Sequence, residues 1–164
     1  MQRSRFARRA IILLGTALVL ASGLRAQMPN PYGNPIPLEK AKLVAAAAAA
    51  EAQKNGWTMA IAVVDSSGDL VFFEKMDGTQ LASLQLSIAK ARAAALFKRP
   101  TKAQEDALAG GGVGLRILKI PDAMPVEGGV PLIENGKIIG AVGVSGAQST
   151  QDGKCANAAA TLVH

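Results

Sequence analysis

AIAVVDSSGDLVFFEKMDG (residues 60–78) and GGVPLIENGKIIGAVGVSG (residues 128–146) are the two stretches of sequence that decide the fold. Each stretch contains two apolar runs joined by a short turn. In the second stretch the turn is Asn135-Gly136, a pair that readily adopts the positive φ angles of a type I′ hairpin turn. In the first stretch, the turn-forming residues Ser66-Ser67-Gly68-Asp69 separate the runs. The two stretches therefore predict two β-hairpins, with four strands in all.

Helical patterns lie on both sides of the first hairpin. Residues 38–55 begin after Pro37, contain an alanine-rich middle and end at Gly56, which suits the position after a helix C-cap. Apolar residues recur at helical spacing over residues 80–97, and Pro100 ends that pattern. Both stretches are predicted to be α-helices.

The rest of the chain continues the alternation of helices and hairpins. A short helix is predicted over residues 101–108, with Thr101 as its cap, and a terminal helix over residues 149–162, with Ser149 or Thr150 as its cap. Residues 110–125 are predicted to form an irregular loop with one short strand around residues 115–118. Hairpins interleaved with helices indicate a single α+β domain, an antiparallel sheet with helices covering one or both faces.

Two patterns in the first 37 residues lie outside this domain. Residues 1–26 join a basic start to an apolar stretch, which is typical of an export signal peptide. The alternative is an uncleaved membrane anchor, but about 15 apolar residues fall short of the roughly 20 that span a bilayer. Residues 27–37 contain four prolines and are predicted to be an extended arm that links the signal to the body. We therefore expect an exported protein, periplasmic or extracellular, with no stable membrane span after cleavage.

The charge of the mature chain argues against nucleic-acid binding. The full chain carries 18 Lys and Arg against 12 Asp and Glu, but five of the basic residues lie in residues 1–26. Without that segment, 13 basic residues face 12 acids, a net charge of about +1. A domain so close to neutrality lacks the basic surface that nucleic-acid phosphates require.

Few side chains offer metal ligation or nucleophilic catalysis. Cys155 is the only cysteine, which excludes an intrachain disulfide, and we expect it to be a buried apolar residue on the terminal helix. The only histidine, His164, occupies a position where a preorganised base is not expected. A structural zinc site is therefore excluded, and no P-loop or Gly-x-Ser-x-Gly motif is present. Asp65 and Asp77 lie at predicted strand ends, where both a turn role and a shared site stay open.

Lys90 has two open interpretations. It lies between Ala89 and Ala91 in the alanine-rich second half of the predicted helix over residues 80–97. Its ammonium either reaches solvent along its own aliphatic stem, or it points into a pocket together with Arg92. In the second case the two cations would favour an anionic ligand such as a carboxylate or propionate.

Three segments of the chain resemble, in order, motifs of the GlcG/HbpS family: AVVDSSGDLVFFEKMDG, LASLQLSIAKARAAALFKRPT and EGGVPLIENGKIIGAVGVSGA. This family includes haem-binding proteins and the C-terminal domain of the PduO adenosyltransferases. The resemblance covers residues 38–163 and implies a profilin-like α+β fold. Some members bind haem or iron, assemble as octamers and degrade haem, whereas GlcG itself has no settled activity. Function must therefore be argued from the site, because fold alone does not set it.

The resemblance implies a shallow ligand site between the second predicted helix and the second hairpin. One departure from the family pattern is Ala93, where many relatives place a threonine three residues after the lysine. The residues that we expect to contact a ligand are Lys90, Arg92, Asp77, Phe97, Gly128, Gly129, Pro131 and Ser145. The available side chains of the types that commonly ligate haem iron are His164, Cys155, Tyr32, Met28, Met59, Met76 and Met124.

Three hypotheses about function follow. The first is an exported haem-binding homo-oligomer, with Lys90 or Arg92 paired to the propionates, that assists haem or iron uptake, sensing or degradation. The second is an enzyme or accessory factor for a small hydroxy- or keto-acid, with Lys90, Asp77 and Ser145 lining a small polar pocket. The third is a structural or sensory oligomer. A pocket too small for a porphyrin would favour the second hypothesis, and the absence of a convergent polar pocket would favour the third.

Overall fold

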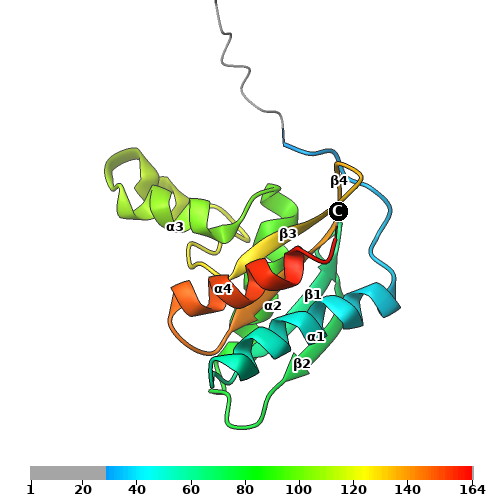
Figure 1. Ribbon diagram of the computed structural model, residues 1–164. Helices are drawn as coiled ribbons and strands as arrows, with labels where there is room; N and C mark the ends of the chain where they lie inside the picture. The colour runs from blue at the N-terminus through cyan, green and yellow to red at the C-terminus, as the bar shows by residue number, and fades with distance from the viewer. Residues whose placement is uncertain (1–28, 164) are drawn as a thin grey trace, which may run out of the picture.

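The computed structural model describes residues 29–163, which form one antiparallel sheet with helices on both faces (Figure 1). The predicted export signal, Met28 and His164 lie outside the described residues. Both predicted hairpins and the four predicted helices are confirmed, and the chain is a single α+β domain. The elements are α1 (Leu38–Lys54), β1 (Ala60–Asp65), β2 (Leu70–Lys75), α2 (Ser83–Phe97), α3 (Thr101–Ala109), the 3-10 helix η1 (Gly112–Lys119), β3 (Gly129–Glu134), β4 (Lys137–Ser145) and α4 (Ser149–Ala160).

The sheet has the strand order β2-β1-β4-β3, so β1 and β4 are the central strands. Asn135 and Gly136 have φ angles of 50° and 71°, as the predicted type I′ turn of the second hairpin requires. In the first hairpin the Asp65 carboxylate accepts the backbone N–H groups of Ser67 and Asp69 at 2.8 and 3.0 Å. Asp65 is therefore a turn residue, and it lies at the opposite end of this hairpin from Asp77.

Alternate residues of the central strands face two different cores. Larger side chains, such as Ile61 and Val142, pack against α1 and α4. Small side chains, such as Ala62 and Ala141, face α2 on the other side of the sheet. The small residues let α2 approach the strands closely, and Gly143 marks the tightest part of this contact, because a Cβ there would lie 2.0 Å from the Ser87 carbonyl oxygen.

The strand predicted around residues 115–118 is wrong, because these residues belong to the 3-10 helix η1. Gly111 and Gly112 have φ angles of 64° and 52° and reverse the chain after α3. Gly114 then lies against the Ala107 carbonyl, where a Cβ would come within 1.7 Å of the oxygen. The glycines therefore fold η1 back onto α3, and no sheet edge is available to residues 115–118.

Two predicted helix caps are also wrong. The Thr101 hydroxyl accepts the backbone N–H of Gly129 at 2.9 Å and does not cap α3. At the start of α4 the N-cap residue is Gln148, whose backbone N–H donates to the Gln151 side chain at 3.1 Å. A tertiary contact thus takes the Thr101 hydroxyl away from α3, whereas α4 keeps a local cap that begins one residue earlier than predicted.

The proline-rich arm is extended, as predicted, but its described part packs along β4 instead of crossing free solvent. Since β1 ends at Asp65, opposite Gly140, the first residues of β4 have no β1 partner. The arm takes that place: the Ile138 N–H donates to the Pro31 carbonyl, and the Gly33 N–H donates to the Ile138 carbonyl, both at 2.8 Å.

Among residues 29–163, no helix is both long and apolar enough to cross a membrane.

Candidate functional site

Lys90 lies in a buried ion pair. Its side chain extends from α2 under the end of β4, and the residue is 1% exposed. The ammonium donates to the Asp152 carboxylate at 2.7 Å and to the Val144 carbonyl at 3.2 Å. The other carboxylate oxygen of Asp152 accepts the Ala147 N–H at 3.1 Å. The interpretation in which Lys90 reaches solvent is therefore wrong.

Two of the predicted site residues, Gly128 and Gly129, pack directly on Lys90. A Cβ at Gly128 would lie 3.0 Å from the Lys90 Cδ atom, and a Cβ at Gly129 would lie 2.2 Å from the Lys90 carbonyl oxygen. The glycines thus allow the start of β3 to cover α2. Burial raises the pKa of the Asp152 carboxyl, and the hydrogen bond from Lys90 opposes that rise. This cluster joins α2, β4 and α4, and two of the three N–H groups of its lysine ammonium are already engaged inside the cluster.

The structure disperses the other predicted site residues. Arg92 lies two residues after Lys90, and positions with this spacing do not share a helix face. Its guanidinium donates to the Gly68 carbonyl at 3.2 Å and to the Asp122 carboxylate at 3.1 Å. Lys90 and Arg92 therefore do not form the predicted cationic pair.

The remaining predicted contacts are also separated. Ser145 is buried and lies 3.3 Å from the Ser83 hydroxyl, so its own hydroxyl is engaged. Pro131 is a buried residue of β3, Asp77 is exposed after β2, and Phe97 is half-buried at the end of α2. The predicted small polar pocket of Lys90, Asp77 and Ser145 does not form in this arrangement.

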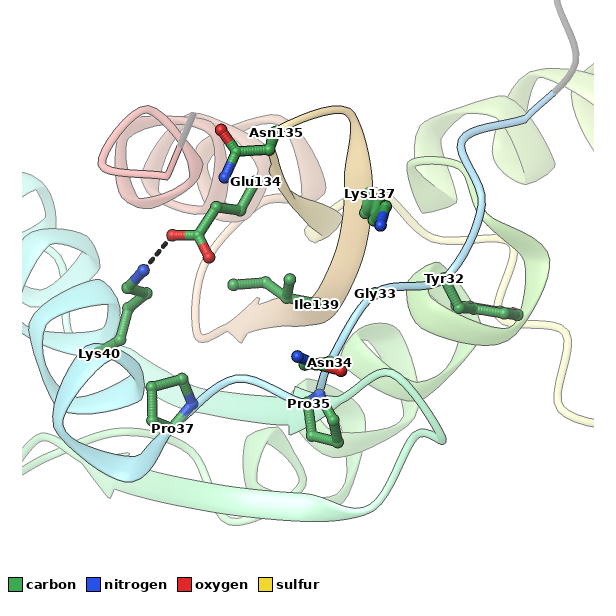
Figure 2. A pocket seen from close by; sticks show the side chains of 10 residues that line it. All are labelled: Tyr32, Gly33, Asn34, Pro35, Pro37, Lys40, Glu134, Asn135, Lys137 and Ile139. Carbon is green, nitrogen blue, oxygen red and sulfur yellow. Dashed lines mark hydrogen bonds and ion pairs between the residues drawn. The ribbon is translucent and has the colours of Figure 1, made fainter.

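An open groove lies between the arm and the β3–β4 turn (Figure 2). We call it the arm groove. Its volume is about 530 Å³, and the buried side chain of Ile139 lies on its inner side. Pro35 and Pro37 supply further apolar surface. The residues that line the arm groove are Tyr32, Gly33, Asn34, Pro35, Pro37, Lys40, Glu134, Asn135, Lys137 and Ile139.

Tyr32 fixes the arm at one end of this groove. Its hydroxyl donates to the carbonyls of Ala95 and Leu96, at 3.0 and 3.2 Å, at the C-terminal end of α2. The Lys98 ammonium lies 4.1 Å from the centre of the Tyr32 ring, within the range of a cation–π contact. Burial raises the pKa of the Tyr32 phenol above its ordinary value of 10.0. These contacts order one wall of the arm groove.

The arm groove carries a net positive charge. Lys40 forms an ion pair with Glu134 at one end, shown by the dashed line in Figure 2. Among residues 29–163, no ion pair includes the Lys137 ammonium, and Asn34 and Asn135 also line the groove. Two lysines, one carboxylate and two amides around an apolar floor can hold a carboxylate-bearing ligand.

Haem is the group that the family resemblance implies, and the arm groove fits part of its chemistry. Lys137 and Lys40 can pair with propionates, while Ile139 and the prolines can contact the porphyrin. Among the groove residues, Tyr32 is the one side chain of a type that commonly ligates haem iron. Cys155 is fully buried, and burial raises the pKa of its thiol to about 11, so it holds its proton and does not reach the groove. No cluster of three metal-binding side chains occurs in the described part of the chain.

Comparisons with known proteins agree with this fold. The family model described as "Haem degrading protein HbpS-like" matches residues 36–161. The chain belongs to the HbpS-like family. The match begins at Ile36, within the arm, so the last residues of the arm are part of the HbpS-like domain. Protein GlcG of Escherichia coli (strain K12) is 41% identical over 107 residues, which cover 65% of this chain and 78% of GlcG.

Two solved structures show the same fold. A double mutant of HbpS from Streptomyces reticuli is 28% identical, with a TM-score of 0.73 over 80% of this chain and 89% of that one. A complex named PduOC:Heme is 25% identical, with a TM-score of 0.71 over 79% of this chain and 96% of that one. The HbpS-like fold is thus established for this chain, and one structural relative is described as a haem complex.

Neither the partner of Lys90 nor the arm groove was predicted from the sequence. Asp152 is separated from Lys90 by more than sixty residues, and only the crossing of α4 over β3 and β4 brings the two together. The groove residues come from the arm, α1 and the β3–β4 turn, whose local patterns predict an extended segment, a helix and a turn. Lys137 directly after Asn135-Gly136 was the available signal, but a charged residue next to a turn is common.

Proposed function

We propose that this HbpS-like protein binds haem in the arm groove, with Lys137 and Lys40 paired to the propionates. The observation that carries the proposal is the pair of groove lysines around an apolar floor, in a cavity of about 530 Å³. The family match and the haem complex of a relative support haem as the ligand. When bound, haem would supply iron and oxygen chemistry, whereas the chain's own residues hold and orient the group.

The test is a titration of the protein with hemin, followed at the Soret band. The wild-type protein should give a saturable shift. Lys137→Ala should weaken binding about two- to fivefold, because a partly exposed ion pair contributes up to about 1 kcal/mol. Lys75→Ala is the matched control, since Lys75 is an exposed lysine on β2, at the other edge and the far end of the sheet.

The wild-type protein and the two variants together test whether haem binds and, separately, whether it binds in the arm groove. A wild-type protein without a saturable Soret shift would overturn haem binding. A saturable shift that Lys137→Ala and Lys75→Ala leave equally unchanged would place haem outside the arm groove. Lys90 stays a predicted contact, but Lys90→Ala is a poor probe, because it leaves the buried Asp152 carboxylate without its partner.

A small hydroxy- or keto-acid is the second candidate ligand. It is favoured by the polar residues that line the groove, which include Lys137, Asn34 and Asn135. Calorimetric titration with lactate and pyruvate tests it, and the absence of any binding heat at millimolar concentration would remove this candidate. The third hypothesis, a structural or sensory module, has less support, because polar side chains line the arm groove.

We also propose that the mature protein is exported and forms a homo-oligomer. The basic and apolar pattern of residues 1–26 supports export to the periplasm or the medium. Mass spectrometry of protein recovered outside the cytoplasm tests this, and a retained Met1 would contradict cleavage. The family resemblance supports an oligomer and implies an octamer as its size.

A further inference from the structure

The α3–η1 hairpin projects from the body of the molecule, on the side away from α1 (Figure 1). Only Thr101 and Gln104 of α3 are buried, and no residue of η1 is buried. The hairpin is therefore held by its own internal contacts and by its base, while most of its surface stays open among the described residues.

This open surface is apolar. Val113 and Leu118 are 69% and 62% exposed, and Leu115 and Ile120 are also exposed. We call these four side chains the η1 patch. Single exposed apolar residues are common on protein surfaces, but a group of them, three on η1 and Ile120 directly after it, marks an interaction site.

Charges around the η1 patch are complementary to one another. Arg116 and Lys119 lie on η1, and no ion pair among residues 29–163 includes either of them. At the base of the hairpin, the Glu105 carboxylate accepts the Glu127 N–H and has no ion-pair partner in the described part of the chain, whereas the Glu127 side chain packs against Gly153 of α4. A surface with unpaired cations at one place and an unpaired carboxylate at another can pair with a copy of itself.

We propose that the η1 patch is a self-association surface on which the α3–η1 hairpin of a second copy of this chain docks about a two-fold axis. This inference rests on the homo-oligomer proposed above and names the surface that holds it together. In such a contact the apolar side chains of both copies exclude water from the centre, and Arg116 and Lys119 of each copy face the Glu105 carboxylate of the other. Both cations and a carboxylate lie beside the patch, which favours a second copy of the chain as the partner. A surface that binds an anionic membrane would be expected to carry cations alone.

The test is the molar mass of the purified protein in solution, measured by light scattering over a range of concentrations. Leu118→Glu should raise the dissociation constant at least about tenfold, because a carboxylate is costly to bury at the centre of an apolar contact. Leu43→Glu is the matched control, because Leu43 is 64% exposed on α1, away from the hairpin. Circular dichroism of Leu118→Glu should match wild type, since no η1 side chain supports the core.

A charge test accompanies the apolar one. Arg116→Glu/Lys119→Glu should also weaken association, whereas Arg116→Lys/Lys119→Arg should keep it, because the second pair of changes preserves the charges. An oligomer whose mass is the same in wild type and Leu118→Glu would overturn the η1 surface and leave the proposed oligomer standing. A wild-type protein that is monomeric over the whole concentration range would overturn both the η1 surface and the proposed oligomer. Binding of that monomer to anionic vesicles would not change this conclusion.

Discussion

At the scale of single residues, the buried ion pair of Lys90 and Asp152 is the most consequential feature. Taking two charges out of water carries a large desolvation cost, which their mutual attraction and hydrogen bonds offset. Here the Val144 carbonyl and the Ala147 N–H complete the hydrogen bonding of the pair. The pair therefore ties α2 to α4 across the end of the sheet, and each charge depends on the other.

We expect Lys90→Met to lower the free energy of unfolding at pH 7 by about 3–5 kcal/mol, because Asp152 would stay buried without its partner. Lys90→Met/Asp152→Asn should recover a substantial part of that loss, since the uncompensated charge is gone and the amide oxygen can still accept the Ala147 N–H. Urea unfolding followed by circular dichroism measures both changes.

The exposed pair of Lys102 and Asp106 provides the control for this experiment. Lys102→Met removes an equivalent lysine from a surface ion pair and should change the free energy of unfolding by less than about 1 kcal/mol. If the double variant is no more stable than Lys90→Met alone, the loss comes from packing around the lysine stem and not from the buried charge.

At the scale of secondary-structure elements, the contact between α2 and β4 decides the shape of the core. The helix and the strand approach so closely that Gly143 lies under the backbone of α2. A side chain at this position would meet the Ser87 carbonyl and the Ala91 backbone nitrogen, which cannot rotate away as a side chain would. Alanines on the facing side of α2 extend the same close approach along the helix.

Gly143→Ala should destabilise the protein by about 1–3 kcal/mol or more, because the added methyl group overpacks a contact made of backbone atoms. Its Cβ would lie 2.0 Å from the Ser87 oxygen and 2.4 Å from the Ala91 nitrogen. Thermal unfolding measures the change.

Gly110→Ala is the matched substitution for this prediction. Gly110 has an ordinary helical φ of −67°, and a Cβ there would come no closer than 3.5 Å to other atoms. We expect it to be neutral within about 0.5 kcal/mol. Equal melting temperatures for the two variants would show that α2 moves away from the sheet at little cost.

An element could be predicted where neighbouring residues in the chain determine it, and could not where contacts between distant elements do. The Asn135-Gly136 turn and the end of α1 at Gly56 follow from backbone preferences of the residues themselves, and both are confirmed. The η1 segment was mistaken for a strand because its apolar residues fit both patterns, and only the contact of Gly114 with α3 distinguishes the two. Lys90 was correctly singled out as unusual, but its partner could not be predicted, because Asp152 comes from an element far away in the chain.

At the scale of the whole molecule, α1 and α4 cover one face of the sheet, α2 covers the other, and the arm closes the end of β4. Cys155 lies at the centre of the first of these layers, between α4 and α1, and is fully buried. Burial raises the pKa of its thiol from its ordinary value of 9.0 to about 11. Unfolding exposes this thiol, so its titration is coupled to the stability of the whole fold.

The free energy of unfolding should fall as the pH rises from about 9 to about 11. Over this interval the folded protein keeps the Cys155 proton while the unfolded chain loses it, so the folded state binds more protons and stability decreases with pH. A difference of about two pKa units corresponds to a loss on the order of 2–3 kcal/mol. Urea unfolding at a series of pH values measures it.

Cys155→Ala separates this effect from the other groups that titrate at high pH. In this variant the free energy of unfolding should fall less steeply with pH, because the contribution of the thiol is gone. This holds whatever the stability of the variant at pH 7. Identical slopes for wild type and Cys155→Ala would contradict the assignment and would point to lysines or Tyr32 as the source of the alkaline instability.

The sequence by itself determined the two hairpins, the four helices, the α+β class and the family, because turn residues, the Gly and Pro residues that end helices, and apolar periodicity act over a few positions of the chain. Only the tertiary structure decided that Lys90 is paired with Asp152, that Arg92 points elsewhere, and that the arm forms a groove with the β3–β4 turn. These features join residues from elements distant in sequence. Their energies come from burial, close approach and charge pairing across packed elements, which no local pattern of residues encodes.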